Sequence, residues 1–261
     1  MSRCSTRVVI LLTLGPGLSL AAVIDAIPST PPVLNGDLGI YSDYIARGLS
    51  YTREGMLLAA RVEYDSPRGP YLGLIANQTT TIANRESVEI DPFIGFVERI
   101  RDLSVDVGAF QWNYPHRRFA VSQNRYNTIE GYLGATYKTI GVKFWYELTD
   151  YFGLNSDSAE PNYAVPQNGS SRGSHYLELN LTQPLPRSFT LSLHAGHQSI
   201  RHYPQLNFTD WRVGIEETLS YSFLVGVARS NTDADRTVYT DSAGLNLARA
   251  KWLGYFKWMF P

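Results

Sequence analysis

Short segments of this chain alternate between apolar and polar residues, and this alternation limits the possible folds most. In Leu103–Ala109, apolar residues at the odd positions alternate with Ser104, Asp106 and Gly108. The segment Gly141–Thr149 alternates in the same way. Because successive side chains of a strand point to opposite faces, such segments predict strands with one apolar and one polar face. Helical periodicity is almost absent, so we expect an all-β fold.

The segments and their connections together predict an antiparallel up-and-down transmembrane β-barrel. We count about twelve strands, at 36–50, 56–65, 70–77, 87–97, 102–113, 127–138, 140–151, 175–183, 188–198, 209–218, 221–231 and 238–249. Apart from the short first connection at 51–55, short and long connections alternate. Tight turns at one end and long loops at the other are typical of bacterial outer-membrane barrels. A soluble sandwich has no reason to sort its loops in this way.

The composition excludes several other classes of protein. Lys and Arg total 23 against 24 Asp and Glu, so the formal net charge is −1. A near-neutral chain without a basic block argues against nucleic-acid binding driven by counterion release. No internal segment approaches the roughly 18 apolar residues that a membrane-spanning helix needs.

The first 22 residues have the layout of a secretory signal peptide. Arg3 and Arg7 precede the apolar run Val8–Leu14, and small residues follow up to Ala22. We therefore predict a signal peptide (1–22), a Pro-rich leader (23–35) and a single outer-membrane barrel domain (36–261). The one cysteine, Cys4, leaves with the signal peptide, so we expect neither disulfides nor thiolate metal sites in the mature chain.

The segment Gly39–Thr52 carries a family resemblance. It reads G-I-Y-S-D-Y-I-A-R-G-L-S-Y-T and resembles the opening signature, roughly G-x-x-S-D-Y-x-x-R-G-x-S-x-T, of the TorF-type family of proteobacterial outer-membrane porins. The likeness recurs in order along the mature chain, at Tyr114-Pro115, Glu130-Gly131-Tyr132, Asp150-Tyr151, Asp210-Trp211 with Gly214, and Asn231-Thr232-Asp233. The resemblance implies an outer-membrane barrel and passive transport, although this family is better defined by its fold than by demonstrated activity.

The polar face of the predicted strands carries most of the ionisable residues. The candidates for lining a pore are Asp43, Arg47, Arg61, Glu63, Glu89, Asp91, Asp106, Glu130, Lys143, Glu147, Glu178, Arg212 and Glu216. A cation at the lipid midplane costs about 2–4 kcal/mol, so we predict that this face surrounds the lumen. If the lumen is open, the excess of carboxylates favours the passage of cations.

A second interpretation of these residues stays open. Twelve strands lie between the filled eight-strand barrels and the open sixteen-strand ones, so a network of ion pairs and hydrogen bonds filling the lumen is an equal alternative. Asp43 and Arg47 share a face but lie about 13 Å apart along one strand, too far for a mutual ion pair. We expect Arg47 to meet Arg61 or Glu63 on the next strand, either as a constriction or as a clamp in folding.

Aromatic residues predict two interfacial girdles on the barrel. One contains Tyr114, Tyr126, Tyr151, Phe152, Tyr176, Phe208 and Trp211, and the other Tyr71, Phe96, Tyr137, Tyr221 and Phe223. The end of the last strand has two solutions. Either a bulge near Arg249–Lys251 shifts its register, or it ends near Trp252 with an aromatic tail beyond. The long connection 152–174 folds inward as a constriction or reaches outward.

An outer-membrane lipid hydrolase is the rival function, because His197 and Ser199 share the lipid-facing parity. No Asn or Asp is spaced to orient His197, so we expect no enzyme. A side-chain-filled structural or adhesion barrel is the other alternative. Neither metal-ligand spacing nor a phosphate-binding glycine loop is found, so we expect no cofactor. The expected partners are outer-membrane lipid and small solutes, with no nucleic acid and a monomer favoured, in a Gram-negative bacterium.

Overall fold

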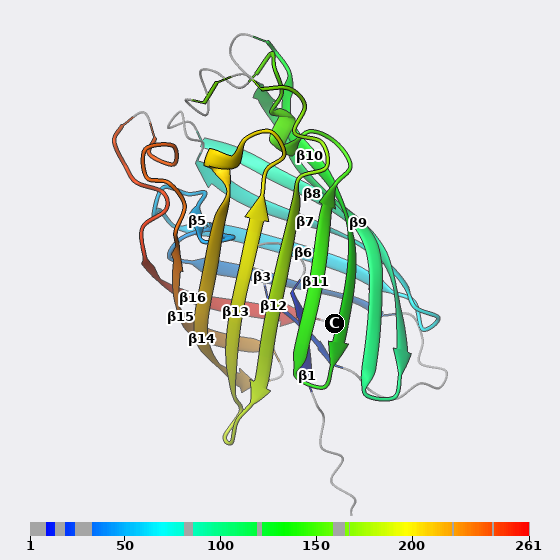
Figure 1. Cartoon of the computed structure of the whole chain (residues 1–261). Helices are drawn as coiled ribbons and strands as arrows, with labels where there is room; N and C mark the ends of the chain where they lie inside the picture. The colour runs from blue at the N-terminus through cyan, green and yellow to red at the C-terminus, as the bar shows by residue number, and fades with distance from the viewer. Residues whose placement is uncertain are drawn as a thin grey trace, which may run out of the picture.

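The computed structural model shows a closed antiparallel barrel of twelve strands (Figure 1). It describes residues 9–13, 19–23, 33–80, 86–118, 122–158, 165–166, 168–220, 222–241 and 243–260. The barrel strands are β3 (Val33–Tyr41), β6 (Leu57–Asp65), β7 (Pro70–Thr80), β8 (Glu86–Ile100), β9 (Leu103–Arg118), β10 (Arg125–Tyr137), β11 (Ile140–Glu147), β12 (His175–Pro184), β13 (Phe189–Ser199), β14 (Phe208–Ser220), β15 (Phe223–Thr232) and β16 (Lys251–Phe260). Neighbouring strands follow chain order, and β16 pairs with β3 to close the ring. The predicted fold class is therefore confirmed.

Four short strands and two 3-10 turns lie outside the barrel sheet. β1 (Val9–Thr13) pairs with β2 (Ser19–Val23), and β4 (Ile45–Ala46) pairs with β5 (Leu49–Ser50). The 3-10 turns are η1 (Tyr151–Gly153) and η2 (Pro204–Leu206). No helix among the described residues is long and apolar enough to cross a membrane. The signal peptide and the leader fall largely outside the described residues, and their division stays a prediction.

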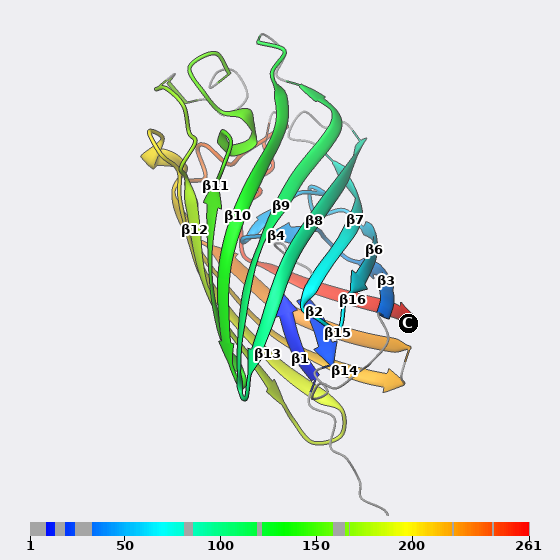
Figure 2. The same cartoon turned by 90° about the vertical axis from the view of Figure 1, so that its right-hand side faces the viewer.

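The first strand is shorter than predicted. β3 ends at Tyr41, and residues 42–56 turn into the barrel, where they form β4 and β5 (Figure 2). The predicted strand 36–50 was wrong beyond Tyr41 because the alternation continues through the hairpin. The first connection is therefore long, and the exception to the alternation of connection lengths disappears.

The last predicted strand, 238–249, was wrong. That segment is a loop with a single bridge between Thr240 and Asn246, and β16 starts only at Lys251. In β16, Trp252 and Trp258 point outward while Leu253 and Lys257 are buried. Neither solution offered by the sequence, a bulge or an aromatic tail, describes this strand. The alternation of Trp252, Phe256 and Trp258 is visible in the sequence, but Leu245 and Leu247 alternate with the opposite parity and indicate an earlier strand.

The two faces of the wall differ as the alternation predicted. On β6 the exposed Leu58 and Val62 alternate with the buried Leu57, Arg61 and Glu63. Large apolar side chains are exposed over the outer face of every barrel strand except β9 and β10 near their long-loop ends. The inner face carries charged and aromatic side chains instead.

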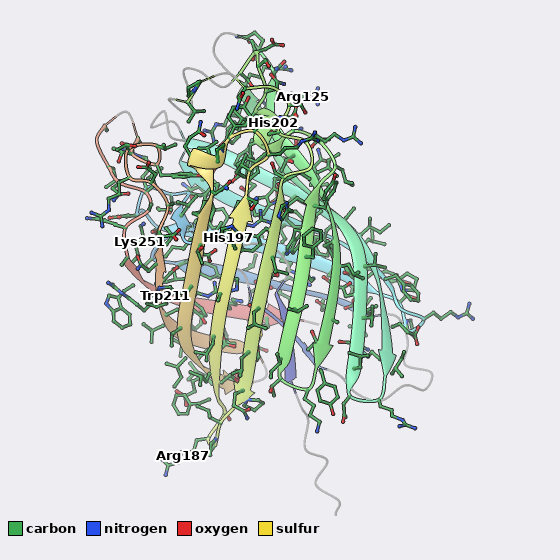
Figure 3. The ribbon with its side chains drawn as sticks, viewed as in Figure 1. Arg125, Arg187, His197, His202, Trp211 and Lys251 are labelled. Atoms are coloured by element: carbon green, nitrogen blue, oxygen red, sulfur yellow. The ribbon has the colours of Figure 1, made fainter. Side chains whose placement is uncertain are left out.

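The predicted aromatic girdles were mostly wrong. Trp211, Phe96, Tyr137 and Phe223 are exposed on the outer face (Trp211 in Figure 3). Seven others are buried inside the barrel: Tyr71, Tyr114, Tyr126, Tyr151, Phe152, Tyr176 and Phe208. Tyr221 lies outside the described residues. The distance of a residue from a loop gives its height along the barrel, but only its parity decides which face it occupies. The wide interior of this barrel accommodates large aromatic rings that a narrow core would exclude.

Candidate functional site

Residues 42–56 fold into the lumen, and we call this segment the plug hairpin. Arg47 (φ 46°) and Gly48 (φ 77°) form its tip between β4 and β5. Two positive φ values in a two-residue turn are typical of type I′ hairpins. A Cβ on Gly48 would lie 2.8 Å from Asp210 Cβ and 2.7 Å from Thr232 Cβ, so the tip touches the wall at β14 and β15.

Arg47 connects the plug hairpin to three strands of the wall. Its Nη2 donates to Glu130 Oε1 at 2.7 Å, and Nη1 donates to Gln198 Oε1 at 2.6 Å. The guanidinium also lies 4.2 Å from the centroid of the Tyr176 ring. Charge-assisted hydrogen bonds and a cation–π contact in one place hold the hairpin tip across the barrel. The prediction that Arg47 meets Arg61 or Glu63 was wrong.

Glu130 belongs to a pair of buried carboxylates beneath this arginine. Glu130 Oε2 accepts a hydrogen bond from Trp112 Nε1 at 2.6 Å. Thr128 donates its hydroxyl to Glu147, which is fully buried like Glu130. We call Arg47, Glu130 and Glu147 the Arg47 cluster. One cation compensates its two carboxylates in part, as a buried ion pair requires.

A second carboxylate pair lies on β8 at the other side of the plug hairpin. Glu89 Oε1 accepts hydrogen bonds from Tyr44 Oη at 2.7 Å and from Asn77 Nδ2 at 2.8 Å. Asp91 Oδ1 accepts the backbone N–H of Asn113 at 2.9 Å. We call Glu89 and Asp91 the β8 pair. Among the described residues, no Lys or Arg forms an ion pair with either carboxylate.

Below the plug hairpin, carboxylates alternate with aromatic and basic side chains. Lys143 Nζ donates to Asp106 Oδ2 at 2.9 Å, and Tyr71 donates to Asp106 Oδ1 at 2.6 Å. Trp145 Nε1 donates to Glu178 Oε1 at 3.1 Å. The two contacts of Asp106 join strands that are not neighbours, β11 with β9 and β7 with β9, whereas Trp145 and Glu178 lie on the neighbouring β11 and β12. Together they add rigidity to the wall.

His194 is bonded on both ring nitrogens. Its Nδ1 lies 2.8 Å from Asn180 Oδ1, and its Nε2 lies 3.1 Å from Asp210 Oδ1. Tyr176 also donates to Asp210, at 2.8 Å.

At the short-turn end, Arg61 pairs with Glu63 and lies 3.8 Å from Asp37. Tyr255 donates to Glu216 Oε2 at 2.9 Å. A small cavity lies nearby, lined by Tyr41, Ser192, Arg212, Ala228, Leu253, Tyr255 and Lys257.

The connection after β11 covers the long-loop end. Its residues 148–158 fold inward and place the Phe152 ring 5.2 Å from Tyr126 and 5.9 Å from Trp112, measured between centroids. Between this aromatic cover and the plug hairpin, Tyr51, Tyr114, Arg117 and Tyr239 help to line a second cavity. The inward alternative is correct for this part, and residues 159–164 and 167 lie outside the described residues.

The thirteen predicted lumen residues all lie on the inside of the barrel or on the plug hairpin, and they form separate clusters. Eleven are buried, and Arg47 and Arg212 are half-buried. Asp43 stays within the hairpin, where it accepts hydrogen bonds from Ser50 and Thr52. Whether these residues line a conducting pore stays a prediction.

On the described barrel strands, sequence reasoning missed four buried charges, Asp37, Asp210, Lys251 and Lys257. Asp210 shares its parity with Arg212, and this parity could have found it. The two lysines were missed because the last strand was misplaced. The additions contain two carboxylates and two ammonium groups, so the excess of carboxylates is unchanged.

The proposed hydrolase pair does not form a catalytic arrangement. His197 Nδ1 hydrogen-bonds Thr209 Oγ1 at 3.0 Å, and no hydrogen bond joins it to Ser199 among the described residues. The side chain of His197 is exposed on the outer face of β13 (Figure 3). This geometry leaves the serine without the adjacent base that activation requires.

With this geometry established, comparison with known proteins identifies the family. The family model described as "Bacterial protein of unknown function (Gcw_chp)" matches residues 25–260. The chain belongs to this family. No curated protein sequence matches the chain. The TorF-type assignment itself stays a prediction.

Two solved structures with a similar fold are porins. The KdgM porin has a TM-score of 0.54 at 10% sequence identity, over 87% of this chain and 99% of that one. The NanC porin has a TM-score of 0.51 at 9% identity, over 88% of this chain and 100% of that one. KdgM has also been solved in complex with disordered oligogalacturonate, with a TM-score of 0.52. At such identities the likeness concerns the fold.

Proposed function

We propose that this Gcw_chp protein is an outer-membrane porin, a narrow diffusion channel for small cations. The observation that carries the proposal is a barrel of porin type whose inner face holds more carboxylates than cations. Fixed negative charge in a narrow, low-dielectric passage raises the local concentration of cations. The KdgM porin was solved with oligogalacturonate, a polyanion. The carboxylates here would repel such a ligand, so we do not extend it to this chain.

In this proposal the plug hairpin is the constriction. It crosses the barrel from Tyr44, which bonds Glu89 on β8, to Gly48, which touches β14 and β15. Solutes pass beside it, between the cavity under the aromatic cover and the cavity at the short-turn end. The hairpin therefore sets the size limit, and the carboxylates set the sign of the charge.

Planar-bilayer recording of the refolded protein tests this function. Under a tenfold KCl gradient, we expect single-channel steps and a reversal potential of the sign set by potassium. The double variant Glu178→Gln, Glu216→Gln should move this potential toward zero. Glu217→Gln is the matched control, because Glu217 follows Glu216 on β14 and shares its carboxylate chemistry on the other face. An anion-selective reversal potential would refute the electrostatic part.

A barrel filled by its own side chains is the second candidate function. It is favoured by the stacking of Phe152 on Tyr126 over the plug hairpin and by the hydrogen bonds of Arg47. Such a protein would fold and insert into bilayers without any conductance. Silence at all voltages, from protein whose gel mobility changes on boiling, would therefore favour this structural role over the channel.

A further inference from the structure

The β8 pair lies just beyond the point where the pairing of β8 with β9 ends. The register between β8 and β9 ends at Phe93 opposite Phe110, although both strands continue toward the long loops. Pro92, which has no N–H to donate, follows next on β8. Beyond this point, the Asp91 carboxylate takes the Asn113 N–H in place of a backbone carbonyl. Figure 2 shows β7, β8 and β9 side by side on this part of the wall.

Two buried carboxylates without a cation are costly in this place. Glu89 is 0% exposed and Asp91 is 1% exposed. Their hydrogen-bond donors are a phenol, an amide and a backbone N–H, none of which carries a positive charge. A buried ionised carboxylate needs a compensating charge or must give up its ionisation.

Two unpartnered oxygen atoms belong to this pair and to the asparagine that bonds it. Glu89 Oε2 and Asn77 Oδ1 are buried acceptors without a hydrogen-bond partner. Asn77 is 2% exposed and lies directly opposite Glu89 in the β7–β8 register. Because its Nδ2 donates to Glu89 Oε1, the amide is held at the carboxylate. Orphaned buried acceptors are rare in folded proteins and point to an ion or a donor that completes them.

We propose that Glu89, Asp91 and Asn77 bind a divalent hard cation, of which Ca²⁺ is the best fit. All the proposed ligand atoms are oxygens, which are the ligands that Ca²⁺ prefers. Ca²⁺ also tolerates irregular coordination by carboxylates, amide carbonyls and water. The two carboxylates match the two charges of the ion. Among the described residues no group of three or more His, Cys, Asp or Glu is placed to hold a metal, so the Asn77 oxygen is essential to this site.

The bound ion would fix one side of the plug hairpin. Tyr44 donates to Glu89, so ordering the carboxylate also orders the hairpin at this wall. The ion would further join β7 to β8 beside the point where the β8–β9 ladder ends. The site thus stabilises the fold whether or not the barrel conducts.

The test measures binding and stability rather than conductance, so its failure is distinct from failure of the channel. Protein refolded in a zwitterionic detergent without lipopolysaccharide is stripped with EDTA and titrated with CaCl₂, and with TbCl₃ under excitation of the aromatic residues. We expect a rise of the unfolding temperature with CaCl₂ and sensitised Tb³⁺ emission that CaCl₂ displaces, because a ligand of the native state stabilises it by mass action.

Variants of similar shape assign the signal to the site. Glu89→Gln with Asp91→Asn should abolish both effects, and Asn77→Ala should weaken them. Glu216→Gln is the control, because Glu216 is a buried lumen carboxylate bonded by Tyr255 and remote from β8. Far-UV circular dichroism and the gel shift on boiling check that each variant folds.

Two outcomes would overturn the proposal. One is wild-type protein that shows neither Tb³⁺ emission nor a Ca²⁺-dependent unfolding temperature between pH 6 and 8. A proton retained on one carboxyl would then compensate the charge of the β8 pair. The other is a double variant that responds like the wild type, which would place the bound ion elsewhere on the protein.

Discussion

Two carboxylate pairs flank the plug hairpin, and they differ in their compensation. Arg47 at the hairpin tip forms an ion pair with Glu130, and its charge also acts on Glu147. Glu89 and Asp91 are equally buried and have uncharged neighbours. Of the two arginines of the hairpin, Arg47 serves the first pair, and Arg53 pairs with Asp241. The comparison teaches that burial alone does not show whether a pair of acids serves a structural contact or binds a ligand.

The largest effect should follow from removing the shared cation. Arg47→Ala leaves Glu130 and Glu147 buried without their partner, and we expect the free energy of unfolding in urea to fall by about 3–5 kcal/mol. The freed hairpin should also raise the single-channel conductance. Arg187→Ala is the matched control, since Arg187 lies exposed at the turn between β12 and β13 (Figure 3). An unchanged stability in Arg47→Ala would remove the distinction between the two pairs.

Neutralising each pair should change stability in opposite directions. Glu130→Gln with Glu147→Gln strands the Arg47 charge, and we expect a loss of about 2 kcal/mol. In EDTA, Glu89→Gln with Asp91→Asn removes uncompensated charge, and we expect a neutral effect or a gain of about 1 kcal/mol. Urea unfolding followed by tryptophan fluorescence measures both variants. Equal losses would show that the two pairs are compensated alike.

Disturbing the hairpin tip should affect one pair and spare the other. Gly48→Ala places a Cβ at positive φ and against Asp210, so we expect a loss of about 1–2 kcal/mol and a raised conductance. Tb³⁺ emission from the β8 pair should persist, because Tyr44 lies away from the tip. Gly254→Ala is the control, since nothing lies within 4 Å of its Cβ position. A loss of Tb³⁺ emission in Gly48→Ala would mean that the hairpin moves as one body.

The smallest effect belongs to the base of the hairpin. Hydrogen bonds from Arg249 hold the pKa of Glu54 below its usual range. A lowered folded-state pKa contributes stability above the unfolded pKa of about 4.3, and this contribution is lost as the pH falls through the folded value. Because the pair is largely solvent-exposed, we expect Glu54→Gln to cost less than about 0.5 kcal/mol at pH 7. The difference from wild type should shrink as the pH falls below about 4.3 and vanish below the folded-state pKa. A difference that grows with falling pH contradicts this assignment.

The sequence predicts the barrel because every strand must place one face on each side of the wall. That constraint is local, so the outward position of Leu58 and the inward position of Arg61 can be predicted without knowledge of the neighbouring strands. The plug hairpin could not be predicted in this way. Tyr41, Asp43, Ile45 and Arg47 continue the alternation of β3, although the chain leaves the wall after Tyr41 and reverses direction at the positive φ values of Arg47 and Gly48.

The partners within the site escape prediction for a related reason. Arg47 and Glu130 are 83 positions apart, and their contact depends on the curvature of the whole ring. The inward aromatics show the same limit, because Tyr114 and Tyr126 were assigned by height alone. What could have been read is the parity of Lys251 and Lys257, which alternate with Trp252 and Trp258 once the strand begins at Lys251.

The pairing of β16 with β3 has a consequence for biogenesis. Phe260 lies opposite Gly36, so the earliest and latest strands of the ring are joined side by side. A sheet that lacks Lys251–Phe260 would therefore have two unpaired edge strands. Their peptide groups cannot form hydrogen bonds with the hydrocarbon of the membrane. Membrane insertion therefore requires the ten-residue strand β16. A chain truncated before Lys251 should be degraded or aggregate and should not accumulate as a smaller barrel.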